Sequence, residues 1–451
     1  MHTERGIFMA SIKKIEGTRG IKYQITVSNG YDSKGKKIRK KATFIPDPNR
    51  TDKQNQKALE RFVFEFETSV IDGTYYDGEN MTLKELSDKW LAEYAEENLT
   101  PKTVENYTYA LNSYIIPNIG HLKIAKIKPL NIQSLWKHLK NDNVRRDGKN
   151  GGLRGTTLKK YHNILSKMFT CAVQWGLIES NPCNRVAAPK IDTQNEDNFF
   201  TPEQAILFLE ALERNYTYTY KSHRRIDDTG KTYTVGDYTE TRKIPLQFQV
   251  FFNISLFGGL RCGEVLALTW NEIDFENKSI TVARSVSYAN HKMMVKEPKT
   301  KSSRRTITMP DCVMRLLRKL KMEQNRRRLS LGTYWNNEEG YLFTQDTGKL
   351  MFYSSPYAKF KEIIHKYNAD VQEDNQLTDE EKKTLLLPDI TLHGLRHTSA
   401  TLLISENVDT RTVSARLGHA QPSTTLNIYA HAIKARDEIA SNTLENMLKV
   451  K

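Results

Sequence analysis

The chain has 451 residues and a formal net charge of +15, from 68 Lys and Arg against 53 Asp and Glu, and its length predicts about three domains of roughly 150 residues. A hydrophobic fraction of 38% excludes a disordered chain. No apolar run approaches the ~18–20 residues of a membrane span, and the N-terminal residues lack an apolar export signal, so we expect neither a membrane protein nor an exported one. Four cysteines without CxxC spacing disfavour a zinc site and a disulfide framework. We therefore expect a cytoplasmic protein without membrane contacts, whose partner is a polyanion.

The first 50 residues carry twelve Lys or Arg and four acids, which is +8 of the total charge. Residues 21–27 alternate with period two and a turn cluster follows at 28–32, so we expect a small three-stranded sheet, then a helix over 56–71. Lysines on an edge strand commonly serve only to prevent aggregation. Six basic residues within eight positions exceed that need and favour contact with phosphates. These residues are Lys34, Lys36, Lys37, Arg39, Lys40 and Lys41.

Residues 80–188 have the pattern of a helical bundle. Thr82 and Glu85 have capping-box spacing, Thr100-Pro101 starts a second helix, Pro129 opens a third, and a fourth runs through 158–175. The Tyr and Trp residues of these helices have core spacing, so packing is their expected role. On the outer faces we expect Lys102, Lys159 and Lys160 to contact a DNA backbone, and residues 190–199 to form a linker.

A third unit begins at the helix cap Thr201 and contains two polar stretches, 215–242 and 368–384, to which the sequence assigns no role. Within it, Arg261 lies between glycines at the head of a helix. Its planar guanidinium and the nearby helix N-terminus suit a phosphate clamp. On its own this signal is weak, because an arginine at a helix start is usually a surface residue.

A hairpin is predicted from strands at 279–282 and 305–309, with Pro298 to Arg304 between them. A lysine on such a turn can protonate a leaving oxygen if neighbouring cations lower its pKa. Lys299 is our candidate, although Lys301 would lie on the same hairpin. Taken alone, the segment would be interpreted as an ordinary lysine-rich turn.

Three further candidates lie near the C-terminus. His393 and Arg396 are three residues apart and would point to one side of a helix. Gly418 ends another helix and leaves His419 just beyond it, and Tyr429 follows in a helix where a tyrosine is usually a core residue. A metal triad of His393, His397 and His419 is the minor alternative, since the zinc-protease pattern requires Glu where this chain has Gly394.

Taken together and in this order, these residues resemble the tyrosine recombinase (phage integrase) family. The family pattern is Arg, Lys on a hairpin, His-x-x-Arg, His or Trp, and then a Tyr nucleophile. This chain fills every position, with Arg261, Lys299, His393, Arg396, His419 and Tyr429. The resemblance is strong over 201–451 and weaker over the helical bundle.

The resemblance implies an α+β multidomain protein: a small N-terminal sheet domain binding arm-site DNA (1–72), a helical-bundle domain binding core-site DNA (80–188), and a mostly α catalytic domain with a β-hairpin or small sheet (198–451). It also implies integration and excision of a mobile element, a conjugative transposon or a prophage, through a 3′-phosphotyrosyl intermediate that needs no metal or ATP. Implied partners are double-stranded DNA, three further copies in a homotetramer, and accessory directionality and DNA-bending proteins. The resemblance also implies that the protein is located in the bacterial cytoplasm and is associated with the nucleoid when it binds DNA.

Two alternatives stay open. A type IB topoisomerase shares the nucleophile and the arginine clamp. The second alternative is a DNA-binding regulator that has lost catalytic activity, although such a protein has no need of Tyr429.

Overall fold

The computed structural model describes residues 10–17, 20–31, 35–71, 80–191, 198–226, 230–297, 304–418 and 447. They belong to two compact units, Met1–Thr193 and Gln194–Lys451. The first unit holds two separate hydrophobic cores, one in its sheet and one in its helical bundle, and the second holds one large core with a small satellite. No helix within the described ranges is long and apolar enough to span a bilayer.

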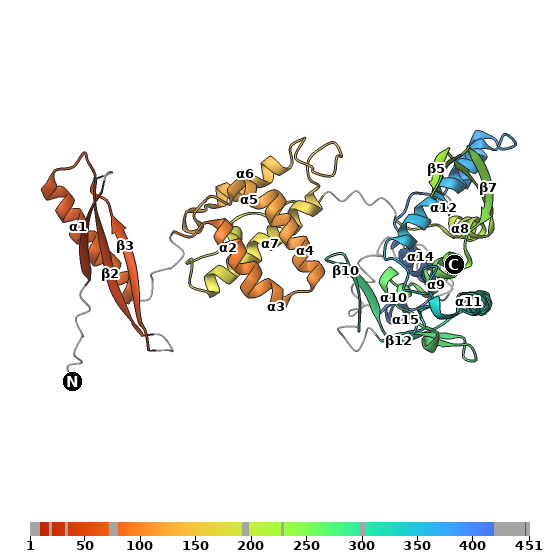
Figure 1. Cartoon of the computed structure of the whole chain (residues 1–451). Coiled ribbons are helices and arrows are strands. Elements are labelled where there is room, and N and C mark those ends of the chain that lie inside the picture. Colours follow the sequence, from red (N-terminus) through yellow and green to blue (C-terminus); the bar gives the residue numbers. More distant parts are fainter. Residues whose placement is uncertain are drawn as a thin grey trace. The chain divides into compact units, whose positions relative to one another are not determined.

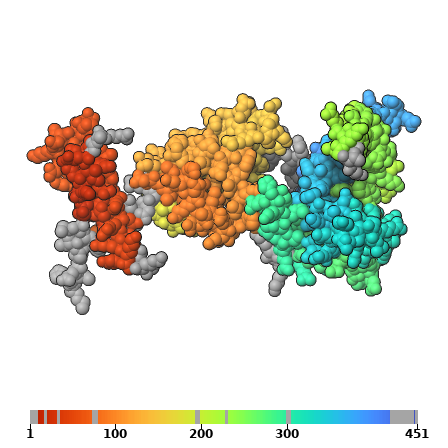
Figure 2. All heavy atoms as spheres, in the orientation of Figure 1, coloured from red at the N-terminus to blue at the C-terminus, as the bar shows by residue number. Residues whose placement is uncertain are grey.

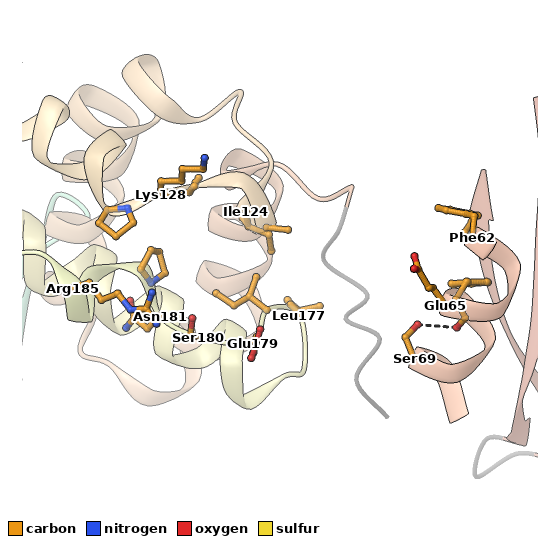
Figure 3. A pocket seen from close by; sticks show the side chains of 17 residues that line it. Phe62, Glu65, Ser69, Ile124, Lys128, Leu177, Glu179, Ser180, Asn181 and Arg185 are labelled. Atoms are coloured by element: carbon orange, nitrogen blue, oxygen red, sulfur yellow. Dashed lines mark hydrogen bonds between the residues drawn. The ribbon is translucent and has the colours of Figure 1, made fainter. Parts of the chain in front are cut away.

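The N-terminal residues form the expected three-stranded antiparallel sheet, with one face covered by a helix (Figure 1). Ile25 and Val27 of the central strand pack against Phe66 and Val70 of that helix. Inside the helix, the Ser69 hydroxyl donates a hydrogen bond to the Phe66 carbonyl (2.8 Å; Figure 3). The elements are β1 (Ser11–Gly17), β2 (Gly20–Tyr31), β3 (Lys37–Phe44) and α1 (Asp52–Ile71).

The period of two along β3 divides the basic run between the two faces of the sheet. Arg39 pairs with Ser28 and Lys41 with Thr26, and both basic side chains are exposed on the face that α1 leaves open. Lys40 lies opposite the buried Val27 and is therefore on the helix-covered side. Lys13, Lys22 and Lys37 share the open face with Arg39 and Lys41, as the strand register requires.

The second part of the first unit is a helical bundle whose helices begin where the sequence predicts. Thr82 and Glu85 form the capping box, and Thr100 caps the helix that starts at Pro101. Trp90 is fully buried and stacks on Tyr94 and Tyr107, which confirms the expectation that the aromatic residues pack. The principal helices are α2 (Leu83–Trp90), α3 (Glu96–Asn98), α4 (Pro101–Ala110), α5 (Ile116–Ile119), α6 (Pro129–Leu139) and α7 (Gly155–Gln174), with π-helical turns at Leu91–Ala95 and Leu111–Ile115.

Asn181 closes the bundle after α7. Its amide group donates to the Ser166 carbonyl (2.9 Å) and to the Thr170 hydroxyl (3.1 Å), and its side-chain oxygen accepts from the Cys183 amide (2.9 Å). Figure 3 shows Asn181 beside Ser180 on this closing segment. Lys159 and Lys160 are exposed on α7, whereas Lys102 is paired with Glu105 at 3.1 Å.

The second unit is built around α9 (Leu246–Gly258), an apolar helix buried over most of its length. Helices contact it on several sides, so the end of α9 is fixed where Arg261 follows (Figure 1). The surrounding helices are α8 (Pro202–Glu213), α10 (Cys262–Leu266), α11 (Asp311–Leu331), α12 (Ser355–Glu373), α13 (Asp379–Leu385), α14 (Gly394–Ser405) and α15 (Thr410–Leu417).

The strands of this unit confirm one predicted pairing and correct another expectation. The strand at 279–282 pairs with that at 305–308 as expected, but they are not a simple hairpin, because a second ribbon lies between them in sequence. Its two-residue turn, Asn290-His291, has positive φ at both positions, as a tight hairpin turn requires. The strands are β8 (Ile273–Asp274), β9 (Ser279–Val282), β10 (Ser285–Ala289), β11 (Lys292–Lys296) and β12 (Arg305–Thr308).

The polar stretch at 215–242 folds as two antiparallel pairs, β4 with β7 and β5 with β6. The Tyr218 hydroxyl donates to Glu362 of α12 (2.7 Å), and Lys366 of α12 donates to the Thr217 carbonyl (2.9 Å). Figure 2 shows this ribbon at the surface of the unit, next to α12. The strands are β4 (Asn215–Tyr220), β5 (His223–Ile226), β6 (Thr232–Val235) and β7 (Tyr238–Lys243).

Candidate active site

Arg261 lies at the N-terminal cap of α10, as the glycine-flanked motif predicts. Gly259 ends α9 in the left-handed conformation (φ 63°), and a Cβ there would lie 2.6 Å from the Leu417 side chain, so only glycine fits. The Arg261 guanidinium is partly exposed and donates to the Glu264 carboxylate at 2.8 Å. One side of Arg261 is thus held by protein while the group stays accessible to solvent.

Arg396 is a buried cation, with 2% of its surface exposed, in the first turns of α14. Its Nη1 donates to the carbonyl of Gly259 (2.7 Å) and to the carbonyl of Leu417 (2.8 Å). Both carbonyls lie at helix C-termini, of α9 and α15, where the partial charge is negative. These contacts offset the desolvation of the guanidinium and fix it beside the segment that carries Arg261.

His393 is the N-cap residue immediately before α14, and Arg396 lies in the first turn of that helix. Its ring meets that of His397 edge to face, with centroids 4.8 Å apart. Partial burial, followed by the charges of His397, Arg396 and Arg261, lowers the pKa of His393 to about 4. Since the side chain remains exposed, a substrate can reach it.

The loop that carries His393 is anchored to the beginning of the second unit. The Asn198 side chain donates to the Thr391 hydroxyl (2.9 Å) and accepts from the Thr391 amide (2.7 Å). The Phe200 amide donates to the Thr398 hydroxyl of α14 (2.9 Å). His393 therefore lies between two hydrogen-bonded anchor points from one short stretch of chain.

Glu264 is the buried acid of the site, and all four of its acceptor positions are used. Oε1 accepts from Arg261 Nη1 (2.8 Å) and Arg305 Nη1 (3.3 Å). Oε2 accepts from the Arg261 amide (3.0 Å) and Arg305 Nη2 (2.8 Å). Burial would raise the pKa of Glu264, but Arg305 and Arg261 together hold it below its ordinary value. The carboxylate thus stays charged.

Arg305 and Arg416 are residues that the sequence analysis did not select. Arg305 Nε donates to the Arg416 carbonyl (2.7 Å), while Arg416 Nη2 donates to the carbonyls of Phe257 (2.8 Å) and Thr308 (3.0 Å). Their partners lie far away in sequence, and no local pattern marks either arginine. Glu264 directly follows Gly263, the second of the two glycines that flank Arg261, and this closeness to Arg261 is the only signal in the sequence that points to the network.

Three predicted catalytic residues, Lys299, His419 and Tyr429, lie outside the described part of the chain, and so do Lys301 and Lys34 of the basic run. After the segment that contains Lys299, the described chain resumes just before β12, which begins at Arg305. It stops immediately before His419, at Gly418, which ends α15 with φ 70° as predicted. Within the described ranges no three His, Cys, Asp or Glu side chains form a metal-binding group. Because His419 is not among those residues, the alternative of a histidine triad is not tested.

The arrangement around Arg261, His393 and Arg396 suits a tetrahedral oxyanion. Two guanidinium groups from different helices can bind separate oxygens, and a neutral imidazole beside them can accept a proton. The cations are positioned before any ligand binds, which is the condition for effective electrostatic stabilisation of a transition state.

Known proteins share this architecture. Residues 233–436 match the model of the phage integrase family, and residues 82–140 match the N-terminal SAM-like domain of phage integrases. A tyrosine recombinase XerC-like protein of Caldanaerobacter subterraneus subsp. tengcongensis is 28% identical over 94% of this chain and 96% of its own length. The ICEBs1 integrase of Bacillus subtilis is 25% identical over 97% of this chain and 100% of its own length.

Among solved structures, the Tn1549 transposon integrase in complex with a circular intermediate DNA has a similar fold. The TM-score is 0.57 at 21% identity, over 80% of this chain and 100% of that chain. Together with the N-terminal sheet of the structure itself, this similarity confirms the predicted fold class: an N-terminal sheet, a helical core and a mixed α and β unit.

The lowered pKa of His393 gives a testable pH dependence. In the unfolded chain a histidine titrates near 6.5, and in the folded protein His393 titrates near 4, so between these pH values the unfolded state binds more protons. The contribution of His393 to stability is therefore complete above pH 6.5 and is lost as the pH falls toward 4. A ring NMR titration of the free protein, with the signal assigned through His393→Gln, should give a midpoint below 6.5. A midpoint at or above 6.5 would contradict the described environment.

Proposed function

The chain belongs to the phage integrase family of tyrosine recombinases, and from this premise we propose that it cleaves and rejoins double-stranded DNA at specific sites to integrate and excise a mobile element. The observation that carries the proposal is that Arg261, at the start of α10, lies near His393 and Arg396, at the start of α14. A relative named as the ICEBs1 integrase supports the proposal, and the mobile element would be a conjugative transposon or a prophage.

In the proposed reaction, Tyr429 attacks the scissile phosphorus. A bond forms between the tyrosine oxygen and phosphorus, and the bond from phosphorus to the 5′ oxygen breaks. His393 helps to accept the tyrosine proton, and Lys299 protonates the departing 5′ oxygen. Arg261 and Arg396 hold the non-bridging oxygens, whose charge grows in the transition state, and His419 adds a hydrogen bond. The energy of the phosphodiester is retained in the 3′-phosphotyrosyl bond, so rejoining requires no ATP.

The low pKa of His393 in the free protein agrees with this role. A bound phosphate between Arg261 and Arg396 adds negative charge next to the ring, which raises its pKa and makes it a better proton acceptor. The ring is thus neutral before DNA binds and becomes more basic once the substrate is in place.

For the rest of the chain we propose three domains: 1–72 for arm-site DNA, 80–188 for core-site DNA and 198–451 for catalysis. Exposed Lys159 and Lys160 support backbone contact by the bundle, whereas Lys102 is a weaker candidate because Glu105 pairs with it. Recombination between two sites requires four active subunits, so the working state would be a homotetramer in the bacterial cytoplasm, assisted by directionality and DNA-bending proteins.

The nucleophile can be tested on a core-site duplex nicked near the crossover, which traps the covalent product. The wild-type protein should form a protein–DNA adduct, and Tyr429→Phe should form none. Tyr334, 80% exposed in the same unit, provides the matched control: Tyr334→Phe should form the adduct normally.

An adduct that persists in Tyr429→Phe would show that the nucleophile is another residue. A wild-type protein that binds the site without forming an adduct would favour the inactive regulator. Relaxation of a supercoiled plasmid that carries no recombination site would favour the type IB topoisomerase.

The general acid can be identified with a substrate whose 5′ bridging oxygen is replaced by sulfur. A thiolate leaves without prior protonation, so only the variant that lacks the acid should recover cleavage. We expect recovery in Lys299→Ala and none in Lys301→Ala, measured as single-turnover cleavage. Recovery in Lys301→Ala alone would transfer the role to Lys301, and each variant serves as the control for the other.

The open face of the N-terminal sheet predicts which basic residues contact arm-site DNA. Replacing Arg39 and Lys41 with Gln should weaken binding and reduce the slope of log K against log salt by about 0.9 for each lost phosphate contact. Lys40→Gln removes the same charge from the helix-covered side and should leave the slope nearly unchanged. The measurement is a binding titration at several salt concentrations. Equal effects of all three substitutions, or intact arm-site binding without residues 1–72, would refute this assignment.

A further inference from the structure

We propose that Arg305 is a positioning residue for strand cleavage, which holds three parts of the catalytic site in one arrangement without touching DNA. This inference rests on the proposed recombinase function. The Arg305 side chain is only 7% exposed, and its guanidinium donates to the Glu264 carboxylate and to the Arg416 carbonyl. These contacts connect the segment that carries Arg261 with the turn that precedes His419.

The first contact is with the Arg261 segment. The Arg305 guanidinium forms a two-bond pair with the Glu264 carboxylate, at 2.8 and 3.3 Å. The same carboxylate binds both the side chain and the amide of Arg261. Because Arg305 occupies half of the acceptor positions of Glu264, it fixes the orientation from which Glu264 holds Arg261.

The second contact is with the turn that precedes His419. Arg305 Nε donates to the carbonyl of Arg416, in the last turn of α15. The guanidinium also lies against Gly418: a Cβ at that glycine would be 2.8 Å from Arg305 Nη1. Arg305 therefore packs against the residue that directly precedes His419.

The third link is through the main chain. Arg305 is the first residue of β12 and follows the segment that contains Lys299 and Lys301. Its neighbour Arg304 has an exposed side chain, and the described residues offer Arg304 no ion pair. Of these two adjacent arginines, only Arg305 is buried in the network. Variants of the two residues remove the same charge from neighbouring positions, so comparing them distinguishes the effect of the contacts of Arg305 from the effect of losing a positive charge.

An arginine is required at this place because its contacts extend in two directions. The guanidinium pairs with Glu264 through Nη1 and Nη2 while Nε binds the Arg416 carbonyl. A lysine keeps the charge but has one compact ammonium group, which cannot reproduce this planar set of donors. Loss of Arg305 would leave Glu264 free to reorient with Arg261, and misplacement of a catalytic group by ~1 Å can slow a reaction by about 10²-fold.

The test compares wild type, Arg305→Gln, Arg305→Lys and the control Arg304→Gln on the nicked core-site duplex. We expect both Arg305 variants to cleave on the order of 10²-fold more slowly in single-turnover assays. Their affinity for the core site should stay close to that of wild type. Arg304→Gln should cleave normally. If Arg305→Gln fails to fold, Arg305→Lys, which keeps the buried charge, carries the test.

A second measurement distinguishes misplacement of Arg261 from a general loss of structure in the catalytic site. When a methyl group replaces one non-bridging oxygen of the scissile phosphate, less negative charge develops and the arginine clamp matters less. The defect of the Arg305 variants should therefore shrink on at least one diastereomer of this methylphosphonate.

Wild-type rates in Arg305→Lys, or equal defects on the phosphodiester and on both methylphosphonates, would overturn the role of Arg305 while leaving the recombinase function intact. A wild-type protein that forms no adduct on a confirmed site would overturn the recombinase function, and the role of Arg305 with it.

Discussion

The buried carboxylate of Glu264 is the interaction on which the catalytic unit depends. It neutralises Arg305, orients Arg261 and accepts from the Arg261 amide at the start of α10. Around it, Arg396 and Arg416 donate to main-chain carbonyls. One buried carboxylate and several carbonyl groups thus hold the guanidinium groups of this part of the unit in place.

Helix ends provide the second constraint. Arg396 binds carbonyls that terminate α9 and α15, and Arg416 binds a carbonyl of the last turn of α9, so the cations are held by helix dipoles as well as by Glu264. Because α9 is packed on several sides by other helices, these carbonyls have little freedom to move. The arginines are thus fixed before substrate binds, which avoids a reorganisation cost during the reaction.

Features governed by short-range spacing could be predicted from the sequence. The capping box at Thr82, the arginine at the head of α10, the His393 to Arg396 spacing and the glycine end of α15 each depend on a few adjacent residues. The ribbon of β10 and β11 was missed because its turn, Asn290-His291, lacks the glycine that usually marks such a hairpin. The roles of Arg305 and Arg416 could not be predicted, since their partners are separated from them by 41 to 159 residues. The basic run at 34–41 is visible in the sequence as a cluster, but only the strand register shows which of its described residues lie on each face of the sheet.

The hydrogen bonds between Asn198 and Thr391 have a mechanical consequence. Asn198 lies where the chain enters the catalytic unit, and Thr391 is two residues before His393. If the entering chain is displaced, either both hydrogen bonds break or the turn that carries His393 moves with the chain. The attachment therefore couples the position of the entering chain to the position of the turn that carries His393.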